Sequence, residues 1–237
     1  MFNEILDGFR KYSQYLIDRQ LDVESQSPSL NITKNTSGNL YSDPIINATI
    51  QDDQLLTVHN SGKTRSYARG AKAIVTYVID GDTIVIKFGN NISTKARLLG
   101  IDCPEIVVSQ KSEWVPKANS KKAFCYGEQA SSKTRKVLTN KEVFINFDLN
   151  PIDQYGRLLL IIYTDKEICL SQKSSTNEIE YSSVVKSFNY ELVQNGFARS
   201  CFYKDNPTFE TIFDQAQDQA KLQLKGAWGF CPFPFQE

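Results

Sequence analysis

Five charged side chains from three short segments could together hydrolyse a phosphodiester bond. Asp82 and Asp102 stand at strand ends, where two carboxylates could meet as hard oxygen ligands for a divalent cation. Arg97 and Arg157 lie beside apolar runs, where a guanidinium needs an anionic partner and can grip a phosphate through two nitrogens. Glu105 follows a proline whose fixed φ stiffens the turn, so its carboxylate could be aimed at a water molecule. A Lewis acid, an oriented water and charge stabilisation are the requirements of this reaction.

Each of these residues also has an ordinary structural interpretation. The pair Asp80-Gly81 before Asp82 is typical of a tight hairpin turn that uses positive φ angles. A single aspartate is more often a solvated surface residue, and either arginine could form a structural salt bridge, for example Arg157 with Asp153. If calcium binds, a backbone oxygen at Cys103 could complete its shell without the thiol, because calcium accepts carbonyls and waters.

The elements that must position these residues are strands and helices after about residue 70. We expect five strands, and a helix between the third and the fourth. The strands are 73–80, 83–89, 93–102, 141–149 and 156–165, and the helices are 121–140, 183–196 and 207–226. This order predicts an α+β fold built on a five-stranded Greek-key barrel of the OB type, a fold often used to bind oligonucleotides.

The composition excludes several classes of function. The chain has 237 residues, 27 Lys and Arg against 27 Asp and Glu, so its overall charge does not favour capture of nucleic acid. Residues 111–141 are different, because eight basic and two acidic residues give this stretch a net charge of +6, enough to follow a phosphate backbone. The single histidine, His59, lies in a polar stretch that we expect to be a surface loop, which argues against mechanisms that need two histidines.

The cysteines and the N-terminus bear on location. Five cysteines without a CxxC pair suggest neither a disulfide framework nor a zinc site, and we expect small buried residues. The apolar run 158–163 is far shorter than the roughly 20 residues of a membrane span, and no signal peptide is evident at the N-terminus. These observations favour a cytoplasmic location over export. We also expect a monomer.

The chain divides into two regions in this interpretation. Residues 1–70 are predicted to be an extension, with an amphipathic helix over the first 21 residues and then a polar linker. Residues 71–232 are predicted to form the main domain, with a polar insertion at about 171–183.

Three ordered motifs resemble the staphylococcal nuclease (thermonuclease) family. VIDGDTIVI (78–86) is similar to its metal-carrying hairpin, RLLGIDCPE (97–105) to its arginine-to-glutamate segment, and DQYGRLLLIIY (153–163) to its second-arginine strand. The resemblance covers about residues 71–230. It departs from the staphylococcal pattern at Gln154, where that pattern has a lysine.

The resemblance implies a calcium-dependent endonuclease that cleaves DNA and RNA and leaves 3′-phosphate ends. It implies that Asp82, Asp102 and the carbonyl of Cys103 bind calcium, and that Arg97 and Arg157 bind the phosphate. It also implies that Glu105 is the general base and that Tyr155 and Tyr203 line a nucleotide pocket. The alternative is a non-catalytic barrel that binds nucleic acid or protein, but such a module does not need all five charged residues.

Overall fold

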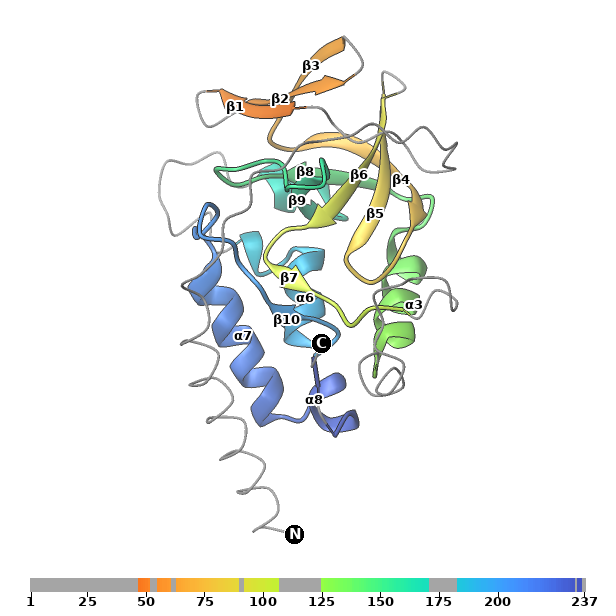
Figure 1. Cartoon of the computed structure of the whole chain (residues 1–237), viewed down its shortest axis with the longest axis vertical. Coiled ribbons are helices and arrows are strands. Elements are labelled where there is room, and N and C mark those ends of the chain that lie inside the picture. Colours follow the sequence, from red (N-terminus) through yellow and green to blue (C-terminus); the bar gives the residue numbers. More distant parts are fainter. Residues whose placement is uncertain are drawn as a thin grey trace. The chain divides into compact units, whose positions relative to one another are not determined.

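The structure, a computed structural model, describes most of the chain after residue 46 (Figure 1). The described residues are 47–51, 55–60, 63–89, 92–106, 125–170, 183–232 and 234–235. The amphipathic helix predicted at the N-terminus and nearly all of the insertion predicted at 171–183 lie outside these residues. The lysine-rich stretch predicted at 111–141 is described only from residue 125 onward.

Five strands form a closed barrel, as the sequence predicted. They are β4 (Ala71–Val78), β5 (Thr83–Phe88), β6 (Ser93–Leu98), β8 (Glu142–Asn146) and β9 (Leu158–Tyr163). The order around the barrel is β4-β5-β6-β9-β8, and β8 pairs with β4 to close it. All neighbours are antiparallel except β6 and β9, which run parallel with Arg97 opposite Leu159. Every residue of β9 is buried, as expected of a strand covered on both faces.

Helices cover the barrel and complete the core. They are α3 (Gly127–Leu138), α4 (Lys166–Leu170), α6 (Phe188–Gln194), α7 (Glu210–Leu222) and α8 (Ala227–Phe230). α3 packs against β4, α4 against β8 and α6 against β9, while α7 packs against α6 (Figure 1). Asn189 on α6 joins the helix to the barrel, because its amide donates to the carbonyls of Leu99 and Leu160 and its oxygen accepts from the backbone of Ile162. None of the helices described is long and apolar enough to cross a membrane.

Part of the predicted extension is a sheet. Three antiparallel strands, β1 (Asn47–Gln51), β2 (Leu55–Asn60) and β3 (Lys63–Ala68), lie before the barrel in the sequence. Leu56 and Val58 are buried, and the ring of Tyr67 stacks on Phe88 of β5 with 3.9 Å between centroids. The prediction of a polar linker is therefore wrong for these residues, since their few apolar side chains are covered by partners distant in sequence. His59 lies in β2, not in a loop.

Two of the cysteines form a disulfide, contrary to our expectation. Cys125, just before α3, is bonded to Cys231, just after α8, across 106 residues of sequence. Cys103, Cys169 and Cys201 are free thiols. Disulfides persist mainly in oxidising compartments, so the cysteines no longer favour a cytoplasmic location.

Candidate active site

The turn between β4 and β5 is shaped by Asp80. Its carboxylate accepts hydrogen bonds from the backbone N–H groups of Asp82, at 3.2 Å, and Thr83, at 2.7 Å. Gly81 is needed here for space and not for a positive φ, because a Cβ at this position would lie 2.6 Å from the Cβ of Cys103. The turn therefore packs directly on the segment that carries Asp102.

Asp82 is the most buried carboxylate of the site, with a relative exposure of 2%. One oxygen accepts from the Thr83 hydroxyl at 3.0 Å and from Nη1 of Arg97 at 3.1 Å, and the other accepts from the backbone N–H of Cys103 at 2.8 Å. Burial raises the pKa of Asp82 to about 7, and the charge of Arg97 offsets this only in part. The site thus holds a carboxylate that would gain from a further positive charge.

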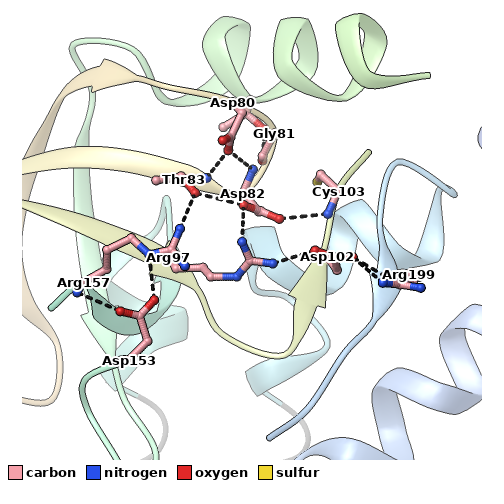
Figure 2. Close-up of polar contacts among 11 residues, drawn as sticks. Asp80, Gly81, Asp82, Thr83, Arg97, Asp102, Cys103, Asp153, Arg157 and Arg199 are labelled. Atoms are coloured by element: carbon pink, nitrogen blue, oxygen red, sulfur yellow. Dashed lines mark hydrogen bonds and ion pairs between the residues drawn. The ribbon is translucent and has the colours of Figure 1, made fainter. Parts of the chain in front are cut away.

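Arg97 joins the two aspartates, as Figure 2 shows. It lies on β6, and its Nη2 donates to Oδ1 of Asp102 at 2.6 Å while its Nη1 donates to Asp82. Asp102 lies on β7 (Ile101–Asp102), directly beyond the bend at Gly100, whose φ is +77°. Burial alone would lower the pKa of Arg97, but the two carboxylates outweigh it and raise the pKa. One guanidinium therefore contacts both carboxylates and brings them to the same side of the barrel.

Glu105 lies within electrostatic range of all four other charged residues. Partial burial is the largest effect on the pKa of this carboxyl and raises it. The charges of Asp82 and Asp102 raise the pKa further, and those of Arg97 and Arg157 lower it. The side chain itself is exposed to solvent. A solvent-facing carboxylate with a raised pKa is a better proton acceptor than an ordinary glutamate.

Arg157 pairs with Asp153, as the structural interpretation proposed. Its Nε donates to Oδ2 of Asp153 at 2.6 Å, while Oδ1 accepts from the backbone N–H of Arg157 at 3.0 Å. Its Nη1 also reaches the Thr83 hydroxyl at 3.4 Å (Figure 2), next to Asp82. The salt bridge thus holds the guanidinium near Thr83, whose hydroxyl links it to Asp82, the partner of Arg97.

Two exposed tyrosines border these charges. The Arg157 guanidinium lies over the Tyr155 ring, 5.2 Å from its centroid, and Tyr155 is 67% exposed. Tyr203 is 45% exposed; burial of its hydroxyl raises its pKa, and the nearby charge of Arg97 lowers it. Exposed aromatic faces beside arginines are typical of surfaces on which nucleic-acid bases stack.

The donor atoms suit a hard divalent cation. Asp82 and Asp102 supply carboxylate oxygens, and the backbone of Cys103 lies beside Asp82. The Cys103 thiol is an unsuitable ligand, because burial and then the charge of Asp82 raise its pKa well above the usual value. In the part of the chain that the structure describes, no three His, Cys, Asp or Glu side chains group to hold a metal. A cation would therefore need carbonyl and water oxygens as well, which calcium accepts.

Arg199 is a site residue that the sequence did not predict. It lies on β10 (Arg199–Ser200), which pairs with β7 so that Arg199 stands opposite Asp102. Its Nε and Nη2 lie 2.9 and 2.8 Å from Oδ2 of Asp102. Only the long-range pairing of two short strands brings these residues together, and no local sequence pattern signals it.

Comparison with known proteins agrees with this architecture. A sequence model of the family described as staphylococcal nuclease homologue matches residues 95–229, which include the segment from Arg97 to Glu105 and Arg157. The thermonuclease of Staphylococcus intermedius is 33% identical over 167 residues, which cover 70% of this chain and 81% of that protein.

Other relatives show the same relationship. The thermonuclease of Staphylococcus hyicus is 33% identical over 155 residues, 65% of this chain and 73% of its own length. The SPbeta prophage-derived endonuclease YokF of Bacillus subtilis (strain 168) is 28% identical over 155 residues, 63% of this chain and 41% of its own. With a closed five-stranded barrel and a family match over residues 95–229, the chain belongs to the staphylococcal nuclease homologue family.

Proposed function

We propose that this chain is a calcium-dependent endonuclease that hydrolyses phosphodiester bonds in DNA and RNA and leaves 3′-phosphate ends. The observation that carries the proposal is the bridge from Arg97 to both Asp82 and Asp102, with Glu105 within electrostatic range of all three. The names of the relatives, two thermonucleases and an endonuclease, support nuclease activity. We expect the protein to act as a monomer on single strands.

Calcium would be held by Asp82, Asp102 and the backbone carbonyl of Cys103. When bound, it would supply a Lewis acid that polarises the phosphate and lowers the pKa of a water molecule. The buried Asp82 carboxylate, with its raised pKa, is electrostatically suited to such a partner, because a nearby cation favours the charged form.

Glu105 accepts a proton from the attacking water in this mechanism. The water oxygen bonds to phosphorus, the bond from phosphorus to the 5′ oxygen breaks, and the leaving oxygen takes up a proton from solvent water. The phosphate then remains on the 3′ side. The raised pKa of Glu105 favours this role, since a base works best when its pKa is near the working pH.

Arg97 and Arg157 stabilise the charge that develops on the phosphate oxygens. Both guanidinium groups are fixed before substrate binds, Arg97 by the two aspartates and Arg157 by Asp153. Donors that are already oriented need no rearrangement as charge builds up, which is the main source of transition-state stabilisation at such sites. Tyr155 and Tyr203 offer ring faces to the neighbouring bases.

The test is cleavage of end-labelled single-stranded DNA and RNA in calcium and then in excess chelator. We expect cleavage in calcium alone, with product ends that terminal transferase extends only after phosphatase treatment. Glu105→Ala and Arg157→Ala should each lose about two to three orders of magnitude in rate. Glu128→Ala, which removes an exposed carboxylate on α3, is the matched control and should cleave normally.

Two outcomes would reject the proposal. Tight binding of the oligonucleotide without cleavage in excess calcium would favour a non-catalytic module. Parent-like rates in both Glu105→Ala and Arg157→Ala would show that the assigned residues do not carry the reaction.

A further inference from the structure

Each oxygen of the Asp102 carboxylate contacts a different arginine. Oδ1 accepts from Nη2 of Arg97 at 2.6 Å, and Oδ2 accepts from Nε and Nη2 of Arg199 (Figure 2). The terminal torsion of an aspartate is otherwise broad, and the two oxygens can exchange places. Because the two oxygens are equivalent, what Arg199 fixes is the plane of the carboxylate, with one oxygen toward Arg97 and the other toward Arg199.

Arg199 is itself held from several directions. β10 pairs with β7 through the register that sets Arg199 opposite Asp102, and the N–H of Ser200 donates to Oε1 of Gln217 on α7 at 3.0 Å. Nη1 of Arg199 lies 3.3 Å from the carbonyl of Phe235, beyond the disulfide-bonded Cys231. The side chain is 21% exposed, so it works in a partly desolvated setting, where a charge-assisted hydrogen bond is stronger than in open water.

We propose that Arg199 is a positioning residue that fixes the orientation of Asp102 and so sets the affinity of the site for its divalent cation. The proposal rests on the function proposed above, because it assigns Arg199 to the calcium site of that reaction. Partners that orient a metal ligand through hydrogen bonds typically raise metal affinity by about 10-fold to 100-fold.

A purely electrostatic role predicts the opposite sign. Arg199 places a positive charge beside Asp102, and a charge at that position repels a cation. If charge alone mattered, its removal would tighten calcium binding, and a lysine at this position would change nothing. If orientation matters, both replacements weaken binding, because lysine cannot reproduce the planar fork of arginine.

The test is calcium binding to the full chain by isothermal titration calorimetry. Arg199→Lys keeps the charge and Arg199→Met removes it, and Arg135→Lys and Arg135→Met on the exposed face of α3 are the matched controls. We expect both Arg199 variants to bind calcium about 10-fold or more weakly, and both controls to bind as the parent does. At saturating calcium, kcat for oligonucleotide cleavage should return close to the parent value.

Three results would overturn the inference. The first is parent-like calcium affinity in both Arg199 variants, even if their unfolding midpoint in chelator is lowered. The second is tighter binding by Arg199→Met with unchanged binding by Arg199→Lys. The third is a kcat in Arg199→Lys that stays low at saturating calcium. If Arg199→Met does not fold, the calcium affinity of Arg199→Lys alone tests the inference. Failure of the parent to bind calcium would instead reject the proposed function.

Discussion

Replacing Asp82 with asparagine should stabilise the protein above about pH 7 when no divalent cation is present. Asp82 is 2% exposed, and burial raises its pKa from 3.8 to about 7. The charged form is therefore less favourable in the folded chain than in the unfolded chain. Asparagine has nearly the same shape but carries no charge.

The pH dependence follows from that pKa shift. Between about pH 4 and pH 7 the folded chain keeps a proton on Asp82 that the unfolded chain has lost. The contribution of Asp82 to the free energy of unfolding thus falls as pH rises through this window, and it stays low above pH 7. Raising the pKa of Asp82 from 3.8 to about 7 corresponds to about 4 kcal/mol. Both carboxylate oxygens accept hydrogen bonds, so the NH2 group of asparagine leaves either Cys103 or Arg97 and Thr83 without an acceptor. This loss costs about 1 to 3 kcal/mol, so the net gain at pH 8 should be about 1 to 3 kcal/mol.

The measurement is urea unfolding of parent and variant at several pH values from 4 to 9 in excess chelator. The quantity compared is the difference in free energy of unfolding between the two proteins, since other groups titrate equally in both. This difference should grow from pH 4 to pH 7 and then level off. Asp214→Asn, at an exposed position on α7, is the matched control for the loss of a surface carboxylate.

A flat difference for Asp82→Asn, or a variant less stable than the parent at pH 8, would refute the reasoning. Adding calcium at pH 8 should reverse the order, because only the parent has the full carboxylate pair to bind it. Equal stabilisation of both proteins by calcium would place the cation elsewhere.

Three further changes should have measurable effects. Paired Cys125→Ser and Cys231→Ser substitutions, or reduction of the parent, should lower the free energy of unfolding by about 2 to 5 kcal/mol in urea, because the disulfide closes a loop of 106 residues. Asn189→Ala should lower the midpoint of thermal unfolding, with a loss of about 2 to 4 kcal/mol, since it removes three hydrogen bonds to backbone groups in the core. Gly81→Ala should weaken calcium binding in calorimetry, because the new methyl group would push against the side chain of Cys103, whose N–H bonds to Asp82.

Much of the barrel could be predicted from the sequence because its strands are dense in β-branched and apolar residues. β5, β6 and β9 each lie within a predicted range, β4 begins two residues before its predicted range, and α3 ends near Asn140, which adopts a left-handed φ of 58°. The strands β1 to β3 could not be predicted, because their burial depends on partners such as Phe88 that are distant in sequence. The composition of a segment shows how polar it is, but it does not show which residues elsewhere in the chain pack against it.

The candidate site was predictable to the extent that its residues stand at strand ends. A charged residue beside an apolar run, such as Arg97 or Arg157, indicates a buried or half-buried charge that needs a partner. The sequence did not reveal Arg199, because its partner lies 97 residues away and meets it only through a two-residue strand. The disulfide was missed for a similar reason, since a count of cysteines carries no information on which two meet in space.

The parallel pairing of β6 and β9 has a consequence for when this protein can become active. Arg97 is on β6 and Arg157 immediately precedes β9. Both guanidinium groups therefore reach their positions in the site only when β6 and β9 have paired. In a chain that has not yet paired these strands, the same charged residues would be present. The two guanidinium groups would not be held where both can bind one phosphate. Nuclease activity is therefore expected only once the barrel has closed.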